Sequence, residues 1–351
     1  MTRLVRQSLT AYAAPLTETV AECPEPRGSE VLVRISRCGV CHSDVHLQDG
    51  YFLLGPDRKL DVTKERTLPF TLGHEIAGTI AAAGPDAADA AIGREVAVFP
   101  WIGCGTCPAC RHGDENICAA PRHLGITVDG GYATHVLVPH PRYLIEHAPL
   151  PAGLAGAFMC SGLTAYSALR RLGERAERGP VLLVGLGGVG MMGLALARAL
   201  FSHAPIVADI DPAKREAALA AGAAAAYDPA DKEARRALLK ATGGVYAACD
   251  FVGSDSSLAF AAGALAKGGK VVVTGLIGGT YTTAIAMFPL KAIAIEGTMT
   301  GTLAEAREMM ALARGGHVPP VPIVERPLAA AQASLDDLRN GRVVGRVVLT
   351  P

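Results

Sequence analysis

The stretch CGVCHSDVH, residues 38–46, places two cysteines, two histidines and an aspartate within nine positions. Thiolate, imidazole and carboxylate groups are the side chains that bind zinc and other transition metals. The stretches GHE and FMCSG contribute further candidates, His74 and Cys160. A catalytic zinc needs three protein ligands and one open position. Because Cys41 and His42 are adjacent, they are poorly placed to bind one ion together, and these residues alone leave the ligand set open.

A second group of thiols lies in GCGTCPACRHGDENIC, residues 103–118. Its C-x2-C-x2-C-x7-C array consists of Cys104, Cys107, Cys110 and Cys118. Four thiolates in so short a loop can close a tetrahedral shell around zinc, with Zn–S distances of about 2.3 Å. Such a shell leaves no position for a substrate, so this zinc would be structural. An iron–sulfur cluster is the competing interpretation, because it also binds soft thiolate ligands. The simplest alternative is that the four thiols bind no metal and lie free on a polar loop.

A glycine-rich turn follows the apolar run VLLV and precedes a helical segment. It consists of Gly185, Gly187, Gly188, Val189 and Gly190, with Leu186 completing G-L-G-G-V-G. Such a turn lets the backbone approach a pyrophosphate, and the N-terminus of the following helix favours its negative charge. The context of strand, turn and helix predicts a dinucleotide site, although a merely structural turn is the alternative.

The next predicted strand, IVADI, supports this interpretation. Asp209 lies near its end, about 20 residues after the turn, where a carboxylate can accept hydrogen bonds from both ribose hydroxyls. The same charge would repel the 2′-phosphate of NADP. Asp211 adds to this repulsion, and Lys214 could brace the adenosine ribose. The sequence therefore predicts NAD rather than NADP.

The elements that must position these groups change in character along the chain. Up to about residue 150, short alternating strands such as EVLVRISRCGV are separated by Gly, Pro and Asp, which predicts an antiparallel, barrel-like β unit. From about residue 160, apolar strands alternate with alanine-rich helices, which predicts a doubly wound parallel sheet. The last stretch, RVVGRVVLTP, predicts a strand that returns to the first unit. The expected α/β organisation is a catalytic domain over 1–158 with a zinc lobe at 103–118, a cofactor domain over 159–295, and a return to the catalytic domain over 296–351.

The composition narrows the classes of partner. Among 351 residues, 33 Lys plus Arg balance 33 Asp plus Glu, and half of the residues are apolar. Without a basic stripe, nucleic acid and membrane surfaces are not expected as partners, which leaves a small, weakly charged molecule. The apolar run 181–200 contains five glycines within nine positions, which predicts a strand, turn and helix rather than a membrane span. Nine cysteines with no secretory signal predict reduced thiols and a cytoplasmic protein.

Five motifs in one order resemble the zinc-dependent alcohol dehydrogenases of the medium-chain dehydrogenase/reductase family. They are C-G-V-C-H-S-D-x-H, G-H-E, the four-cysteine lobe, C-S-G-L-T-A-Y and G-L-G-G-V-G, and together they span nearly the whole chain. The resemblance implies a GroES-like β-barrel catalytic domain and a Rossmann cofactor domain. It also implies one catalytic and one structural zinc per chain, and reversible oxidation of primary or secondary alcohols to aldehydes or ketones with NAD.

The resemblance assigns the catalytic zinc to three ligands, Cys41, His74 and Cys160. Asp44 would accept the other ring N–H of His74 and so fix its tautomer. Glu75 would sit behind the metal and enter its coordination transiently. An alcohol holds its hydride tightly while its oxygen is protonated, so a Lewis acid at this position fits the implied reaction.

The other matched residues would handle the proton, the cofactor and the substrate. Ser43 would accept the proton of the alcohol and pass it through the nicotinamide ribose to His46 and solvent. His42 and Arg346 would lie near the cofactor pyrophosphate. Trp101, just before the four-cysteine lobe, resembles the aromatic wall of the substrate pocket.

Simpler interpretations stay open for several of these residues. Ser43 could only cap a helix that starts near Asp44, His46 could be a solvated loop residue, and His123 is expected on the surface. The stretch 51–69 is longer than in compact family members, and it either reshapes the pocket mouth or forms an inert surface loop. Serine in place of threonine at the relay position slightly favours bulkier or secondary alcohols.

Two alternative functions also stay open. An NADP-linked aromatic alcohol or aldehyde reductase would require Asp209 to tolerate a 2′-phosphate. A redox sensor would keep NAD and zinc without turnover. The family forms dimers and tetramers through the cofactor domain, and the short lobe favours a homotetramer, with a dimer as the alternative.

Overall fold

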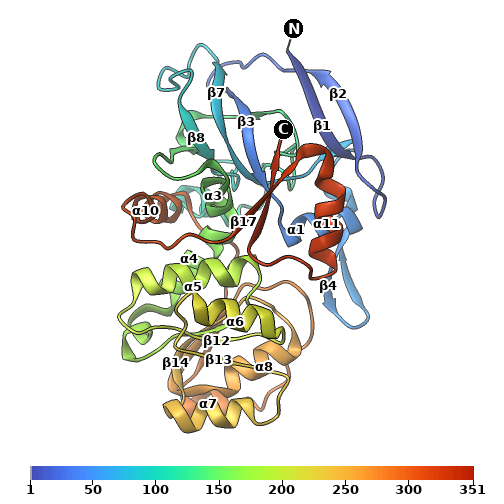
Figure 1. Ribbon diagram of the computed structural model, residues 1–351. Helices are drawn as coiled ribbons and strands as arrows, with labels where there is room; N and C mark the ends of the chain where they lie inside the picture. The colour runs from blue at the N-terminus through green and yellow to red at the C-terminus, as the bar shows by residue number, and fades with distance from the viewer. Residues whose placement is uncertain (1) are drawn as a thin grey trace.

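The computed structural model describes residues 2–351 and has two parts joined end to end (Figure 1). The N-terminal strands and the C-terminal strand lie in one part, and the chain between them builds the other. We call the first part the barrel region, defined by the three-stranded and seven-stranded sheets, and the second the Rossmann region, defined by the six-stranded sheet.

The barrel region contains a three-stranded sheet in the order β2-β1-β6 and a seven-stranded sheet in the order β10-β8-β7-β3-β18-β17, with β9 also paired to β3. In the larger sheet every pair is antiparallel except β17 with β18. The strands are β1 (Arg3–Leu9), β2 (Thr17–Glu22), β3 (Val31–Gly39), β6 (Phe70–Thr71), β7 (Glu75–Ala83), β8 (Glu95–Val98), β9 (His135–Val138), β10 (Leu144–Glu146), β17 (Ile323–Pro327) and β18 (Arg346–Thr350). The helices beside them are α1 (His42–Asp49), α2 (Pro108–His112), α10 (Leu303–Arg314) and α11 (Ala331–Arg339).

The Rossmann region contains six parallel strands in the order β13-β12-β11-β14-β15-β16. This is the 3-2-1-4-5-6 order of dinucleotide-binding sheets, so the predicted doubly wound fold is confirmed. The strands are β11 (Leu182–Val184), β12 (Ile206–Ala208), β13 (Ala225–Tyr227), β14 (Val245–Asp250), β15 (Leu265–Val273) and β16 (Ala294–Gly297). The helices are α5 (Gly188–Leu200), α6 (Pro212–Ala220), α7 (Ala234–Thr242), α8 (Asp255–Gly263) and α9 (Met287–Lys291).

The apolar run 181–200 divides into β11, a turn and α5, as predicted. All three residues of β11 are buried, which is typical of a parallel strand covered on both faces. By length and composition, the helical segment 152–178 could cross a membrane, but 94% of its most apolar window is buried inside the protein. That degree of burial is what the core helix of a folded domain shows.

This helical segment connects the two regions. It runs through α3 (Ala152–Ala157), a π-helical turn (Phe158–Gly162), α4 (Leu163–Leu172) and a final 3-10 turn (Gly173–Arg178). The domain boundary expected after residue 158 therefore falls inside continuous helix. The main hydrophobic core includes buried side chains from α4, α5, β3 and β7, so it extends across both regions.

The end of the chain returns to the barrel region beside the first metal-capable stretch. In β18, Val348 pairs with Gly39 and Leu349 with Cys38, both at the end of β3. The backbone N–H of Val40 also donates to the Val347 carbonyl at 2.9 Å. The C-terminal strand thus fixes the approach to Cys41.

A separate two-stranded hairpin occupies part of the long stretch 51–69. It consists of β4 (Tyr51–Gly55) and β5 (Arg58–Asp61), followed by a short 3-10 turn (Thr63–Glu65). The hairpin projects from the barrel region toward the Rossmann region (Figure 1).

Candidate active site

The first metal-capable residue sits where β3 gives way to α1. Cys41 is the N-cap residue of α1, and its sulfur accepts a hydrogen bond from the backbone of Asp44. In return the Asp44 carboxylate accepts from the Cys41 N–H at 3.0 Å. This reciprocal cap fixes the sulfur at a helix N-terminus, where negative charge is favoured. Ser43 lies inside the first turn, so the prediction that it caps the helix is wrong.

Asp44 is a fully buried carboxylate that gathers donors from distant parts of the chain. Besides the Cys41 N–H, it accepts from the Gly73 N–H at 3.2 Å and the Tyr132 hydroxyl at 2.8 Å. Its Oδ1 also lies 3.3 Å from His74 Nδ1. Tyr132 was not identified from the sequence, because nothing in the strand-like stretch around it indicates a polar partner. These contacts hold the carboxylate where it can orient the imidazole of His74.

Cys160 is placed by an irregular helical turn. It lies in the π-helical turn between α3 and α4, and such turns occur often at functional sites. Its sulfur joins Cys41 Sγ and a ring nitrogen of His74 in a cluster whose ligand atoms all lie within 4.8 Å of one another. All three residues are buried. The fold therefore brings together three groups that are far apart in the sequence.

The donor set of this cluster fits zinc. Neither ring nitrogen of His74 has a hydrogen-bond partner of good geometry within residues 2–351, although the ring is fully buried. A hydrogen bond from Cys160 and the charge of His74 hold the pKa of the Cys41 thiol well below its usual range. The same hydrogen bond and burial raise the pKa of Cys160. Two neighbouring sulfurs and a buried imidazole fit a zinc site with three protein ligands and one open position.

A buried ion pair lies behind the cluster. Glu75 is fully buried and pairs with Arg346, and its Oε1 accepts from the Ser161 N–H at 3.2 Å. Burial raises the pKa of Glu75, although the Arg346 charge opposes the shift. A Cβ atom built on Gly188 would collide with Arg346 Nη1. Arg346 therefore lies between the Glu75 carboxylate and Gly188, the first residue of α5.

Aromatic rings pack against the other side of the cluster. The Trp101 ring centroid lies 5.5 Å from that of His74, and its indole N–H donates to the Met159 carbonyl at 2.9 Å. Trp101 is thus fixed beside the candidate metal. The expectation that His123 lies on the surface is wrong: its ring is buried and meets the indole edge-on at 5.4 Å. Burial lowers the pKa of His123 to about 4, so this ring is neutral and extends the wall behind Trp101.

The candidate relay residues follow one another along α1. His42 is exposed, Ser43 is half-buried, and the ring of His46 lies 5.6 Å from that of His42. The ring of Phe52 from the hairpin covers His46, with centroids 4.9 Å apart. His46 lies on α1, so its interpretation as a loop residue is wrong. The helix carries Ser43 and His46 about one turn apart, and both are half-buried.

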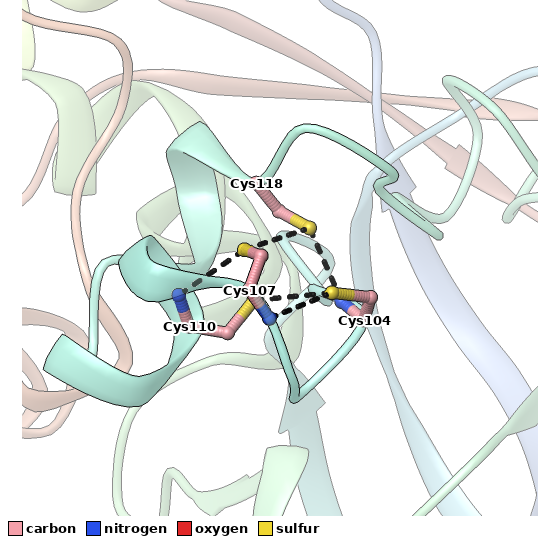
Figure 2. A group of neighbouring side chains, drawn as sticks. All are labelled: Cys104, Cys107, Cys110 and Cys118. Atoms are coloured by element: carbon pink, nitrogen blue, oxygen red, sulfur yellow. Dashed lines mark hydrogen bonds between the residues drawn. The ribbon is translucent and has the colours of Figure 1, made fainter.

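The four-cysteine lobe forms a compact group around α2 (Figure 2). Cys104 Sγ lies 3.9 Å from Cys110 Sγ, and Cys107 Sγ lies 3.8 Å from Cys118 Sγ. Tetrahedral sulfurs at about 2.3 Å from zinc would be about 3.8 Å apart. The Cys104 N–H donates to Cys118 Sγ at 3.2 Å, and the Cys107 N–H donates to Cys104 Sγ at 3.4 Å. The spacing and the backbone donors fit a closed zinc site.

A buried carboxylate attaches this lobe to the barrel region. Glu115 accepts from the Gly103 N–H at 3.0 Å and the Tyr143 hydroxyl at 2.6 Å, and it pairs with Arg142. Asn116 reaches in the other direction, donating from Nδ2 to the Met299 carbonyl at 2.7 Å. Neither role could be read from the sequence, where these residues are only two of several polar letters between the third and fourth cysteines.

The glycine turn has the geometry of a pyrophosphate cradle. Gly185 has a φ of +91°, which an ordinary side chain rarely adopts, and a Cβ atom on Gly190 would collide with the Gly185 carbonyl oxygen. A Cβ atom built on Gly187 would have nothing within 4 Å, so open space lies over the turn. Gly188 and Val189 begin α5 and present its free N–H groups. Tight turn, open approach and close helix packing are the three roles of glycines in dinucleotide sites.

Asp209 lies beside this turn, at the end of β12. Its Oδ2 accepts from the Leu186 N–H at 2.6 Å, and its Oδ1 accepts from the Asp211 N–H at 2.9 Å. A carboxylate has about four lone-pair sites, so two backbone donors leave capacity for ribose hydroxyls. Lys214 Nζ lies 3.8 Å from Asp211 Oδ2. The glycine turn, Asp209, Asp211 and Lys214 therefore lie in one neighbourhood, and Arg346 contacts Gly188, whereas no contact places His42 beside them.

Comparison with known proteins agrees with this geometry. Residues 27–149 match the family described as alcohol dehydrogenase GroES-like domain, and residues 188–315 match the zinc-binding dehydrogenase family. The chain is 37% identical to NAD-dependent alcohol dehydrogenases from Sulfurisphaera tokodaii and Saccharolobus solfataricus, over 98% of this chain and 99% of each relative. A solved alcohol dehydrogenase from Aeropyrum pernix superposes with a TM-score of 0.87 at 28% identity, covering 99% of this chain and all of the other. This chain belongs to the zinc-type alcohol dehydrogenases, the family that joins a GroES-like domain to a zinc-binding dehydrogenase domain.

Proposed function

We propose that this protein is an NAD-dependent alcohol dehydrogenase that interconverts primary or secondary alcohols with aldehydes or ketones. The observation that carries the proposal is the buried cluster of Cys41, His74 and Cys160, which offers three zinc ligands backed by the Asp44 carboxylate. When bound, zinc supplies the Lewis acidity that lowers the pKa of a hydroxyl, and NAD supplies the hydride acceptor.

The residues of this chain bind, orient and move the proton. Asp44 holds the ring of His74 so that one nitrogen faces the two sulfurs. The Ser43 hydroxyl, two positions beyond Cys41, accepts the proton of the alcohol. His46, one turn further along α1, carries it to solvent. Burial lowers the pKa of His46, which keeps the ring neutral and able to accept a proton at neutral pH.

The barrel region positions the substrate, and the Rossmann region positions most of the cofactor. Trp101 packs beside His74 and forms the inner wall of the alcohol pocket. The glycine turn and the N-terminus of α5 receive the pyrophosphate, with His42 and Arg346 nearby. Asp209 accepts the ribose hydroxyls and disfavours a 2′-phosphate, so we infer a preference for NAD over NADP.

We also propose one catalytic and one structural zinc in each chain. The lobe supports the second ion, because its sulfur spacings of 3.8 and 3.9 Å match a tetrahedron of thiolates. Metal analysis should give two zinc ions per chain, and Cys104→Ser should remove one of them. A single ion in the unaltered protein would contradict this count.

The assembly we propose is a cytoplasmic homotetramer built first through the Rossmann region. Strand β16 pairs with β15 and ends the six-stranded sheet of the described chain. Exposed apolar side chains lie in and around the segment leading to it: Leu276, Ile277, Ile285, Leu290 and Met299. Apolar side chains beside an unpaired strand edge are features of a self-association surface. Light scattering should report four chains per particle, and a monomer would refute the proposal. None of the nine cysteines, all of which lie in the described residues, is joined in a disulfide, which supports a reducing compartment.

The deciding experiment is NADH formation from NAD with a panel of primary, secondary, benzylic and polyhydroxy alcohols. Parallel reactions use NADP, and a Cys160→Ala variant serves as the control. Turnover that disappears in this variant supports the zinc mechanism, and the best alcohol identifies the substrate class.

Two outcomes would favour the alternatives. Faster turnover with NADP than with NAD would identify an NADP-linked reductase and contradict the role given to Asp209. Binding of zinc and NAD without turnover of any alcohol or aldehyde would identify a sensor.

A further inference from the structure

The β4–β5 hairpin is firmly attached to the barrel region at its base. The Val62 N–H donates to the Gly50 carbonyl at 3.0 Å and closes the hairpin where it leaves α1. The Tyr12 hydroxyl donates to the Thr63 carbonyl at 2.9 Å, and the buried Arg66 donates to the Val62 carbonyl at 2.7 Å. These three bonds fix the start of the hairpin, so its strands leave the barrel region in a defined direction.

The middle of the hairpin covers the candidate relay. Phe52 in β4 is half-buried, and its ring lies 4.9 Å from the ring of His46 at an interplanar angle of 39°. The charged groups around His46 come from two helices. His42 and Asp49 share α1 with it, and Arg339 of α11 pairs with Asp49 at 2.6 Å. Cys41, at the start of α1, adds its charge to those that face His46. Phe52 thus supplies an aromatic contact to the ring of His46.

The far part of the hairpin rests on the Rossmann region. A Cβ atom built on Gly278, whose φ is +95°, would collide with the Leu53 carbonyl oxygen. A Cβ atom built on Gly55 would lie 3.3 Å from Thr280 Cγ2. So close an approach of two backbones requires glycine at 278. The contact joins a strand of one region to a loop of the other.

The surface on which the hairpin rests is itself held in place. The Gly278 N–H donates to the Gly253 carbonyl at 3.0 Å, and the Ile277 N–H donates to the Val252 carbonyl at 3.1 Å. Residues 252 and 253 lie two and three positions beyond the end of β14, a central strand of the six-stranded sheet. A shift of the Rossmann region would therefore be transmitted through Gly278 to Leu53 and its neighbour Phe52.

We propose that the hairpin is a brace between the two regions and that Phe52 is a positioning residue for His46. The inference rests on the proposed function, in which His46 carries the proton to solvent. With the brace seated on Gly278, Phe52 holds the His46 ring in one orientation and keeps water from its apolar face. A displacement of the Rossmann region away from the hairpin would remove the support of the brace and loosen the relay. The relay is thus fully assembled only while the Rossmann region is in place.

The contact at Gly278 can be tested with a matched pair of variants. Gly278→Ala places a methyl group against Leu53, whereas Gly268→Ala introduces the same substitution at a φ of +80° with nothing within 4 Å. Both variants strain the backbone to a similar degree, so their difference isolates the brace. Hydrogen exchange of the hairpin amides, residues 51–61, should be about tenfold faster in Gly278→Ala than in Gly268→Ala. Equal exchange in the two variants would overturn the docking contact.

The role of Phe52 is tested by the pH profile of kcat/KM for alcohol oxidation. Because burial lowers the pKa of His46, Phe52→Ala should expose the ring and move the acid limb of the profile to higher pH. Phe52→Leu should restore much of the original profile. Leu54→Ala removes an exposed apolar side chain from the same strand and should leave the limb unchanged. A uniform loss of kcat/KM at every pH in Phe52→Ala would mean only a structural or substrate contact and would overturn the proposal.

The two levels of inference fail in different ways. If the unaltered protein oxidises no alcohol, the proposed function fails before any variant is compared. If it oxidises alcohols but neither the hairpin exchange nor the acid limb responds as expected, only the brace is refuted.

Discussion

The two cysteine clusters of this protein both offer sulfur ligands, but one is a four-thiol loop at the surface and the other is a buried set of two thiols and an imidazole. The lobe takes its four sulfurs from 15 consecutive positions, 104–118, and three of its cysteines are partly exposed. The cluster that we propose as catalytic takes Cys41, His74 and Cys160 from a helix start, the residue before a strand and a π-helical turn, and all three are buried. A local loop can complete its own shell. A zinc site with an open coordination position needs only three protein ligands, here from distant parts of the chain, and space for a substrate that the whole fold maintains.

The groups that surround the sulfurs differ in the same way. In the lobe, backbone N–H groups point at Cys104, Cys107 and Cys118. Around Cys41, His74 and Cys160, one backbone N–H points at the Cys41 sulfur, and the Asp44 side chain lies 3.3 Å from His74 Nδ1. A backbone N–H remains when most side chains are substituted, whereas a side-chain partner is lost in a single substitution. Single substitutions should therefore alter chemistry at the catalytic cluster and stability at the lobe.

The largest expected effect is the loss of turnover in Cys160→Ala. Removing a ligand forfeits Lewis acidity worth several kcal/mol, so kcat/KM should fall by about 10³-fold or more. Cys249→Ala is the matched control, because Cys249 is an equally buried free thiol in β14, away from the cluster. Steady-state kinetics with zinc analysis makes the measurement. Equal losses in both variants would mean that buried volume, and not metal binding, is what Cys160 contributes.

A smaller effect is expected for the carboxylate that orients His74. Asp44→Asn keeps the shape but removes the charge, and loss of such a partner lowers metal affinity by about 10- to 100-fold. Tyr132→Phe removes one hydrogen bond to Asp44 and keeps the charge, so its effect should be weaker. Competition with a zinc chelator gives the affinity of the catalytic site in each variant. An unchanged zinc affinity in Asp44→Asn would show that Cys41 and His74 keep their positions without the charge of the carboxylate.

The difference between the clusters also explains what the sequence could predict. The residues of the lobe and of the glycine turn lie close together in the sequence. Residues 104–118 therefore predict a zinc site, and residues 185–190 predict a dinucleotide site, from their spacing alone. The catalytic ligand set came from family resemblance, because the pairing of β18 with β3 and the π-helical turn around Cys160 arise from tertiary packing. Tyr132, Glu115 and the buried position of His123 were missed for the same reason.

At the lobe, Cys104→Ser should lower stability much more than chemistry. Loss of one thiolate releases a zinc whose binding contributes to folding, so the melting temperature should fall. The folded fraction should keep its kcat/KM within a few-fold, because the catalytic ligands are untouched. Thermal unfolding and kinetics on one preparation provide both values. A loss of kcat/KM as large as that of Cys160→Ala, with the fold retained, would erase the distinction between the two clusters.

The smallest expected effect tests whether the lobe is isolated from the Rossmann region. Asn116 donates from Nδ2 to the Met299 carbonyl, two residues beyond β16 of the Rossmann region, so Asn116→Ala should cost about 1 kcal/mol of stability. Asn340→Ala is the control, since Asn340 donates to the Asp336 carbonyl at an exposed helix end. If the lobe only stabilises the fold, the affinity for NAD should stay within about twofold of the unaltered protein, a difference below about 0.5 kcal/mol. A larger loss of NAD affinity in Asn116→Ala than in Asn340→Ala would mean that the lobe also helps to position the Rossmann region. The cysteines of the lobe would then still act only on stability, but the residues around them would also affect cofactor binding.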